Sequence, residues 1–464
     1  MSSPKNEFIA RVREVVGPRY VDTRTEELFG YSYDASFGCT KGTPVLPAVI
    51  VKPANKEEIS KLMQLATAYR IPVVPRGAGS NNSGGTLPVD GCMVLETNRL
   101  NRILELDKRN LTVRVQPGVI TGQLHRVVEA EGLFYPPDPA SLDFCTIGGN
   151  LAECAGGPRG VKYGVTRDYV LQLEAVLADG TVIRTGTQTI KGVTGYDLTR
   201  LLVGSEGTLA IFTEALLRLI PLPQAHHTIL AVYDDIRAAA DSVGAIIAGG
   251  IVPACLEFMD RVLIKCVEEY AHIGLPTEAE AVLLLDLDGH PAAIADEALA
   301  VEKICRGLSV RDLHSAADEE QRQQLWAARR AAFPAIVRLR PNVLTEDVVV
   351  PRDKFADMVM QAQGIGEKYQ LLVGMAGHAG DGNLHVEILT DENDEVEMAR
   401  VQQAVLEILQ TAVELNGTIA GEHGVGRLKA PYLGLEIKKE VMATMQAIKQ
   451  ALDPLGLLNP GKFI

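Results

Sequence analysis

The residues best suited to chemistry lie in a short glycine-rich stretch of the second half of the chain. Residues 374–385 read Gly-Met-Ala-Gly-His-Ala-Gly-Asp-Gly-Asn-Leu-His and put His378 and His385 on either side of a turn. Apolar residues flank this stretch at 371–373 and 386–389, which predicts a strand, a tight turn and a second strand. Residues that face each other across such a turn have Cβ atoms about 5 Å apart, so two histidines there could hold one metal ion.

A second polar cluster lies at residues 421–427, which read Gly-Glu-His-Gly-Val-Gly-Arg and add the carboxylate of Glu422 and the imidazole of His423. Two imidazoles and one carboxylate suit Zn, or a neighbouring divalent metal such as Fe or Mn, with an open position for a substrate. The simpler alternative is that these histidines are turn residues without a ligand. Spacing alone leaves both interpretations open.

A glycine-rich loop early in the chain predicts contact with a phosphate group. Residues 75–85 read Pro-Arg-Gly-Ala-Gly-Ser-Asn-Asn-Ser-Gly-Gly and follow a predicted buried strand. Glycines let backbone N–H groups approach an anion, and Ser80 and Ser83 add hydroxyl donors. The loop lacks the P-loop lysine, and Asn82 stands where the Rossmann pattern needs its third glycine, so it is neither of the two commonest nucleotide motifs.

More backbone-exposing segments follow this loop, at residues 136–139, 146–150, 155–157 and 204–209. Each could be an ordinary turn. As a spaced series, they suit a large, elongated and partly anionic ligand.

Composition excludes several classes of protein. With 464 residues and 47% hydrophobic content, the chain is long enough for two or three domains with substantial cores. Its formal charge of -14 argues against nucleic acid or an anionic membrane as a general partner. No apolar run reaches membrane-spanning length and the N-terminal region has no signal-peptide core, so we expect a cytoplasmic protein that meets a membrane only through a partner.

The cysteines are scattered and odd in number, without CxxC spacing, so we expect no disulfide framework, zinc knuckle or iron–sulfur site. They are Cys39, Cys92, Cys145, Cys154, Cys255, Cys266 and Cys305.

Hydrophobic periodicity predicts a βαβ opening after a helical lead-in and linker at residues 1–45. The helix at 56–70 has one apolar face, formed by Ile59, Leu62, Met63 and Ala66. The predicted strands of this part are residues 48–52, 71–74, 92–96, 111–115, 173–177 and 209–219.

From about residue 220 the pattern changes, and Pro221 and Pro223 mark a boundary. Strands at 227–233, 254–259 and 281–287 alternate with helices at 236–248 and from 292 onward. This alternation predicts a ferredoxin-like, largely antiparallel α+β domain.

The glycine-rich segments, in this order, resemble the FAD-binding domain of the vanillyl-alcohol oxidase superfamily. The stretches at 378–385 and 421–427, with Leu-Leu-Asn-Pro-Gly-Lys at 457–462, are similar to the flavin-linked D-2-hydroxyacid dehydrogenases, which include D-lactate dehydrogenase and the catalytic D subunit of glycolate oxidase. The resemblance implies an α+β fold in three parts. These are a vanillyl-alcohol oxidase-type two-part FAD-binding domain (1–221), a ferredoxin-like antiparallel-sheet cap domain for the substrate (222–425) and a short C-terminal helical segment that returns to the flavin (426–464).

The resemblance implies FAD, and we expect it to be bound non-covalently because the 75–85 loop has no His or Cys. Relatives read Glu-Asn-Ala-Gly-Gly at 153–157, so Cys154 replaces an amide and puts that one contact in question. The residues assigned to FAD are Arg76, Gly77, Ala78, Gly79, Ser80, Asn81, Ser83, Gly84, Pro137, Asp138, Ser141, Gly148, Gly149, Asn150, Cys154, Gly156, Gly157, Glu206, Gly207, Thr208, Ile211 and Asn459.

The resemblance also implies a mechanism. In relatives a divalent metal is held by the residues that match His378, His385 and Glu422. The metal would orient a 2-hydroxy acid and lower the pKa of its hydroxyl group. His423 would accept the hydroxyl proton as a general base, and the Cα hydride would pass to flavin N5. A purely structural role for His423 is the alternative.

Arg329 matches the family arginine that pairs with the substrate carboxylate, with Arg330 as the competing candidate. The 2-hydroxyglutarate enzymes carry Lys at the position of Thr345, and the loss of that cation favours a small monocarboxylate, D-lactate or glycolate. D-2-hydroxyglutarate remains the alternative substrate.

We expect electrons to pass to a separate protein, which could be an iron–sulfur subunit, an electron-transfer flavoprotein or a cytochrome. The chain could also form a homodimer. Two other interpretations predict different sequence features. A transferase similar to alkylglycerone-phosphate synthase should have adjacent histidines and a longer chain. A non-catalytic flavin subunit of a glycolate oxidase-like complex should lack the histidines and glutamate named above.

Overall fold

The computed structural model describes residues 4–38 and 42–463, so the expectation for Cys39 lies outside the described residues. Contacts divide the chain into two compact units. Unit 1 comprises Met1–Ala155, Val165–Leu222 and Glu422–Ile464, and unit 2 comprises Gly156–Gly164 and Pro223–Gly421. Residues 156–164, which sequence analysis placed in the FAD-binding domain, therefore make their contacts with unit 2. The functional borders at 221/222 and 425/426 stay predictions.

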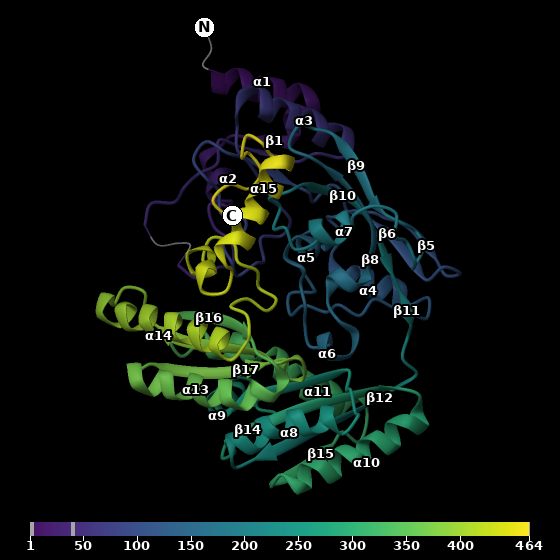
Figure 1. Cartoon of the computed structure of the whole chain (residues 1–464), viewed down its shortest axis with the longest axis vertical. Helices are drawn as coiled ribbons and strands as arrows, with labels where there is room; N and C mark the ends of the chain where they lie inside the picture. Colours follow the sequence, from purple (N-terminus) through teal and green to yellow (C-terminus); the bar gives the residue numbers. More distant parts are fainter. Residues whose placement is uncertain (1–3, 39–41, 464) are drawn as a thin grey trace. The chain divides into compact units, whose positions relative to one another are not determined.

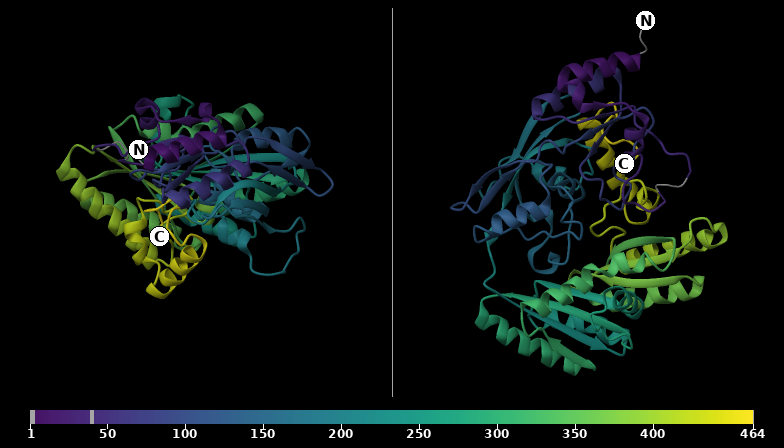
Figure 2. Two further views of the ribbon diagram at one scale, coloured as in Figure 1. Left: turned by 90° about the horizontal axis from the view of Figure 1, so that it is seen from above. Right: turned by 180° about the vertical axis from the view of Figure 1, so that it is seen from behind.

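Unit 1 begins with a small sheet of order β1-β2-β4-β3, in which β2 and β3 both run parallel to β4. Its strands are β1 (Val21–Asp22), β2 (Val49–Val51), β3 (Val73–Arg76) and β4 (Met93–Glu96). The lead-in contains α1 (Pro4–Val16) and α2 (Thr25–Phe29), as expected, but also the unpredicted strand β1. Helix α3 (Lys56–Tyr69) buries the predicted apolar face and lies beside α1 (Figure 2).

The second sheet of unit 1 is antiparallel, with order β5-β6-β10-β8-β9. A two-stranded ribbon pairs β7 (Leu133–Phe134) with β11 (Ile220–Pro221). The five strands are β5 (Ile103–Asp107), β6 (Thr112–Val115), β8 (Val170–Val176), β9 (Val182–Gly186) and β10 (Ile211–Arg218). The helices of this part and of the C-terminal segment are α4 (Thr121–Glu129), α5 (Ile147–Glu153), α7 (Leu198–Leu202) and α15 (Lys439–Leu452).

Unit 2 is built on one antiparallel sheet of order β15-β12-β14-β13-β17-β18-β16. The order β15-β12-β14-β13 is ferredoxin-like, as predicted, and three further strands extend it. The strands are β12 (Ala225–Tyr233), β13 (Cys255–Asp260), β14 (Ala281–Gly289), β15 (Asp312–Ser315), β16 (Asn342–Val349), β17 (Leu372–Gly377) and β18 (Asn383–Thr390). The main helices are α8 (Ile236–Ala248), α9 (Arg261–Ala271), α10 (Pro291–Gly307), α11 (Glu319–Arg330), α12 (Ala332–Ile336), α13 (Phe355–Tyr369) and α14 (Glu395–Glu414), of which α13 and α14 lie side by side (Figure 1).

The two faces of this sheet differ in character. Phe258 of β13 packs edge-on against Phe355 of α13, with ring centroids 5.8 Å apart. Because side chains alternate along a strand, its neighbours Glu257 and Met259 point to the opposite face. Met259 packs there with α9, α11 and α12. Glu257 thus introduces a charge on the face covered by these three helices. Within the described ranges, no helix combines the length and apolar character needed to cross a membrane.

Candidate active site

The two histidines of the glycine-rich stretch lie next to each other in unit 2. Their rings have centroids 5.2 Å apart and are inclined at 87°. The prediction of a tight turn between them was wrong. Strands β17 and β18 do pair, but residue 376 lies opposite His385, and residues 378–382 form a longer connection with a 3-10 turn. Gly382 closes this connection at φ +86°, where an added Cβ would lie 2.0 Å from the carbonyl oxygen of Val350.

Glu257 links two of the predicted site residues, and sequence analysis missed it. One carboxylate oxygen lies 2.8 Å from Nδ1 of His378, and the other accepts a hydrogen bond from Nε of Arg329 at 2.7 Å. Burial favours a raised pKa for Glu257, but the charges of His378 and Arg329 outweigh it and lower the pKa. A glutamate in the middle of the apolar strand 254–259 was the one sequence signal.

The geometry separates the two arginine candidates. Arg329 is largely buried, and apart from the bond to Glu257 its guanidinium makes no hydrogen bond to the described residues. Arg330, the next residue of α11, is exposed. Arg329, and not Arg330, therefore shares the carboxylate of Glu257 with the predicted metal ligand His378.

Asp347 connects the sheet to the second polar cluster. It lies opposite His385 in the β16–β18 pair, with 3.7 Å between Oδ1 and Nδ1 of that histidine. Its carboxylate accepts hydrogen bonds from Nδ2 of Asn383 at 2.6 Å and from the backbone N–H of Gly421 at 2.9 Å. Gly421 is the last residue of unit 2, and the chain continues from it directly into Glu422.

Thr345 and Glu387 face each other across the same pair of strands, and their side chains are hydrogen-bonded at 2.6 Å. Burial raises the pKa of Glu387 to about 7, against the hydrogen bond from Thr345 and the charge of Arg329. Glu387 is a second functional candidate that the sequence did not reveal.

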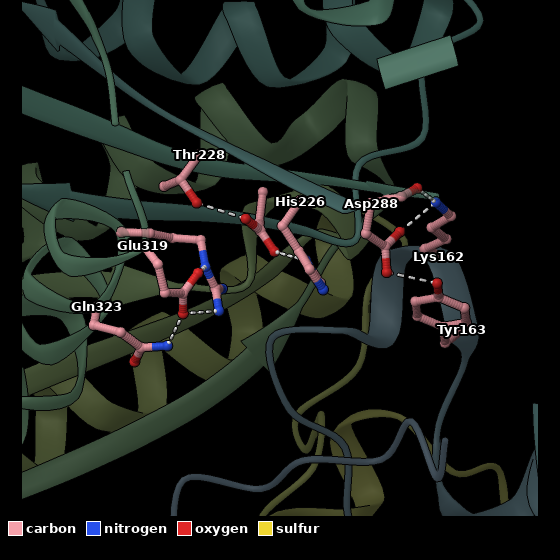
Figure 3. A network of polar contacts seen from close by, with 9 residues as sticks. Lys162, Tyr163, His226, Thr228, Asp288, Glu319 and Gln323 are labelled. Carbon is pink, nitrogen blue, oxygen red and sulfur yellow. Dashed lines mark hydrogen bonds and ion pairs between the residues drawn. The ribbon is translucent and has the colours of Figure 1, made fainter. Parts of the chain in front are cut away.

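A separate polar network farther along this sheet anchors residues 156–164 to unit 2 (Figure 3). Nζ of Lys162 lies 2.5 Å from Oδ1 of Asp288, and the Tyr163 hydroxyl donates to Oδ2 at 2.7 Å. On the neighbouring strand, Thr228 and His226 contact Asp286 at 2.6 and 3.0 Å. Each buried carboxylate thus has two side-chain partners, as buried charges require.

In unit 1, the glutamate of the 204–209 segment anchors the loop that follows His423. Glu206 accepts hydrogen bonds from the backbone N–H groups of Val425 and Gly426 at 2.8 and 2.7 Å. Oε2 of its neighbour Glu153 is buried, and burial together with the charge of Glu206 raises the pKa of Glu153 well above its usual value.

Several segments assigned to FAD come together in unit 1. Nδ2 of Asn459 donates to the carbonyl oxygens of Gly85 and Glu206 at 2.9 and 2.7 Å. A Cβ added to Gly77 would lie 2.3 Å from Oγ1 of Thr146, the N-cap residue of α5. Four segments are therefore neighbours in unit 1. They are the glycine-rich loop, the start of α5, the 204–209 segment and the C-terminal segment around Asn459.

Other assigned residues use their side chains or carbonyl groups within the protein. Oδ1 of Asn81 accepts from the backbone N–H of Gly85 at 2.8 Å. The carbonyl oxygen of Pro137 and Nδ2 of Asn150 bond to His125 and Thr121. Cys154 is the C-cap of α5 in the left-handed region, at φ 54°.

The remaining residues assigned to FAD fall in both units. Arg76, Ala78, Gly79, Ser80, Ser83, Gly84, Asp138, Ser141, Gly148, Gly149, Gly207, Thr208 and Ile211 belong to unit 1, whereas Gly156 and Gly157 belong to unit 2.

Two buried polar atoms among the described residues of unit 1 fit a cofactor. Oγ of Ser205 and Oδ1 of Asn459 are buried without a hydrogen-bond partner in the described structure, although both lie in segments assigned to FAD. Buried polar atoms are normally hydrogen-bonded, so a ligand rich in hydroxyl and phosphate groups suits these positions.

Comparison with protein families identifies the family to which this chain belongs. The family described as "FAD linked oxidases, C-terminal domain" matches residues 222–463, and the family described as "FAD binding domain" matches residues 47–186. The chain belongs to the FAD-linked oxidases. It is therefore a flavin-dependent oxidoreductase, and the suspected family resemblance is confirmed.

Relatives within the FAD-linked oxidases match almost the whole chain. The glycolate oxidase subunit GlcD of Bacillus subtilis is 49% identical over 97% of this chain and 95% of the relative. The protein of the same name from Escherichia coli K12 is 38% identical, over 90% and 84%. The D-lactate dehydrogenase of Anaerostipes hadrus is 33% identical, over 98% and 97%.

Solved structures confirm the expected fold of this FAD-linked oxidase. A p-cresol methylhydroxylase superposes with a TM-score of 0.82 at 16% identity, covering all of this chain and 97% of the other. An alkyldihydroxyacetonephosphate synthase superposes with a TM-score of 0.78 at 20% identity, covering 99% and 86%. At these identities, the likeness concerns the fold alone.

Proposed function

We propose that this FAD-linked oxidase is a divalent-metal-dependent dehydrogenase that converts a small D-2-hydroxy acid, D-lactate or glycolate, to the 2-oxo acid. The relatives named for glycolate and D-lactate support this substrate class. The single observation that carries the proposal is the position of Glu257, which binds both His378 and Arg329. One buried carboxylate thereby holds a histidine, which can bind a metal, beside an arginine, which can bind a substrate carboxylate.

Arg329 binds the substrate carboxylate. Its Nε is held by Glu257, which leaves the two terminal nitrogens to form a fork that matches a carboxylate. Lysine could not reproduce this arrangement, because it offers a single point charge. Binding at Arg329 would orient the acid on the face of the sheet that carries Glu257 and His385.

His378, His385 and Glu422 are the proposed metal ligands. Because an ionised carboxylate only accepts hydrogen bonds, Nδ1 of His378 carries the proton that Glu257 binds, and Nε2 keeps its lone pair. His385 lies beside it on the same sheet face. Two imidazoles and one carboxylate suit Zn, Fe or Mn, and such an ion, when bound, supplies Lewis acidity that favours loss of the hydroxyl proton.

His423 is the proposed general base. It follows the ligand Glu422 in the sequence, and the loop after it is held by Glu206 through two backbone hydrogen bonds. Its imidazole offers a nitrogen that can accept the hydroxyl proton. FAD, when bound, supplies the hydride acceptor.

Electrons then pass to a separate protein, an iron–sulfur subunit or an electron-transfer flavoprotein. The relatives in Bacillus subtilis and Escherichia coli are named as subunits of glycolate oxidase, which supports a partner for this chain. Rapid oxygen consumption by the isolated protein, with peroxide formed at the rate of substrate oxidation, would contradict this part of the proposal.

Anaerobic mixing of the FAD-loaded protein with D-lactate, L-lactate, glycolate and D-2-hydroxyglutarate tests the function. Loss of the yellow absorbance of oxidised flavin with D-lactate or glycolate, but with neither L-lactate nor D-2-hydroxyglutarate, is the expected result. Reduction by D-2-hydroxyglutarate alone would establish the alternative substrate. Reduction by none of the acids would favour a non-catalytic flavin subunit.

The metal is tested separately. Treatment with a chelator should abolish flavin reduction while FAD stays bound, and addition of Zn, Mn or Fe(II) should restore it. The variant His423→Ala should keep its metal and FAD but lose flavin reduction. Full activity in metal-free protein would overturn the metal requirement.

A further inference from the structure

Glu387 and Thr345 form a buried polar pair on the sheet face that carries the proposed ligands. Glu387 is 7% exposed, and its side chain has one hydrogen-bond partner among the described residues, the hydroxyl of Thr345 at 2.6 Å. A carboxylate has two acceptor oxygens, and the Thr345 hydroxyl uses only Oε2, so Glu387 can accept a further hydrogen bond. The pair is therefore available to a ligand.

The position of Glu387 places it beside the proposed substrate groups. It lies two residues beyond His385 on β18, so the two side chains point to the same face about 6.5 to 7 Å apart along the strand. The register through β17 puts Glu387 on the same face of the sheet as Glu257, the residue that holds Arg329. A 2-hydroxy acid held at Arg329 and His385 uses its carboxylate and hydroxyl there, which leaves its C2 substituent to meet Glu387.

We propose that Glu387, oriented by Thr345, is a specificity-determining residue that selects 2-hydroxy monocarboxylates with a further hydroxyl group on C3, of which D-glycerate is the simplest. This inference rests on the proposed function and adds a preferred substrate, beyond D-lactate and glycolate, within the class of small D-2-hydroxy acids. A C3 hydroxyl donates to the carboxylate of Glu387. The methyl group of D-lactate cannot donate a hydrogen bond to the carboxylate of Glu387. The second carboxylate of D-malate would lie beside the carboxylate of Glu387, and no cation would offset the repulsion between them.

The test compares D-glycerate, D-lactate and D-malate as substrates of the FAD- and metal-loaded protein, with a dye as electron acceptor. The wild type should prefer D-glycerate to D-lactate by about tenfold or more in kcat/KM. The variant Glu387→Leu should remove or reverse that preference. Glu387→Gln should keep it, because an amide still accepts a hydrogen bond, and should raise kcat/KM for D-malate by about tenfold.

Equilibrium binding provides a readout that does not depend on turnover. Calorimetry should show tighter binding of hydroxypyruvate than of pyruvate to the wild type, and no such difference for Glu387→Leu. Glu397→Gln is the matched control, because Glu397 is also a largely buried glutamate bound by a threonine hydroxyl, that of Thr390 at 2.8 Å. The control should leave both substrate ratios unchanged.

The outcomes separate the two proposals. If neither these three acids nor glycolate reduces the wild-type flavin, the proposed function and this inference both fail. If acids are oxidised but the ratio of D-glycerate to D-lactate is one or less and is the same in Glu387→Leu, only the inference fails. Should Glu387→Leu not fold, Glu387→Gln decides, and an unchanged kcat/KM for D-malate in that variant overturns the inference.

Discussion

Glu257 is joined to Nδ1 of His378 at 2.8 Å, and its side chain has no exposed surface. Carboxylates in this position fix the tautomer and ring orientation of a metal-binding histidine and make its other nitrogen a stronger ligand. The same carboxylate holds Arg329. A single strand residue therefore controls both the proposed metal ligand and the group proposed to bind substrate.

Replacing Glu257 by glutamine should weaken metal binding by about 10- to 100-fold, because the amide cannot hold the Nδ1–H of His378 as strongly as the charged carboxylate does. Titration of metal-free protein with Zn measures this directly. Glu397→Gln, a control in the same unit, should bind the metal like the wild type. Equal affinities for the wild type and Glu257→Gln would mean that Glu257 does not orient a ligand.

Arg329→Lys should lower kcat/KM for the hydroxy acid by about 10- to 100-fold, mainly through KM, since the forked contact with the carboxylate is lost. Steady-state kinetics with D-lactate or glycolate give the split between KM and kcat. Arg330→Ala, one residue away and exposed, should stay close to the wild type. A larger effect at Arg330 would reverse the assignment.

The pH dependence of stability should reflect Glu153. Its pKa is raised above 4.5 in the folded protein, so the folded state binds this proton more tightly than the unfolded chain does. Stability should therefore fall as the pH rises above about 4.5, until the folded group also ionises. Glu153→Gln should remove this decline and stabilise the protein by about 1 kcal/mol at pH 8, because the amide carries no charge that has to be buried beside Glu206.

Urea unfolding of the wild type and Glu153→Gln between pH 5 and pH 8 checks this prediction. Parallel curves for the two proteins over this range would show that Glu153 ionises alike in the folded and unfolded states.

Cys154→Asn should stabilise the protein by about 0.5 kcal/mol. Residue 154 ends helix α5 with φ 54° and ψ 47°, a left-handed conformation that asparagine adopts more readily than cysteine. Thermal unfolding of the apoprotein measures the change without a contribution from the cofactor. Cys154→Val, which has a β-branched side chain, should be destabilised instead. A less stable Asn variant would refute the conformational argument.

Much of the fold could be predicted because its elements carry strong local patterns. The helix Ile236–Ala248 has the predicted bounds, and α3 ends within one residue of its prediction, since both repeat apolar residues at helical spacing. Strand β1, with only Val21 and Asp22, has no pattern of its own and forms by pairing with β2. Short edge strands of this kind depend on tertiary contacts.

The candidate site was predictable where its residues share one segment. His378 and His385 are neighbours as expected, but the connection between them is longer than the predicted tight turn, because residues 379–381 form a 3-10 turn. Glu257 and Glu387 were missed, since a lone glutamate in an apolar strand gives no sign of its partner. The partner of Glu257, His378, lies 121 residues away in the sequence.

The path of the chain also limits how the molecule could be divided. Residues 223–421 form one continuous segment of unit 2. However, the polar network around Asp288 also needs Lys162 and Tyr163 from the separate segment 156–164. A recombinant fragment that starts at Pro223 would lack both partners of the buried carboxylate of Asp288. The fragment should therefore be less stable, because an unpaired buried charge costs free energy. Addition of a short peptide spanning 156–164 should rescue such a fragment, in the manner of fragment complementation.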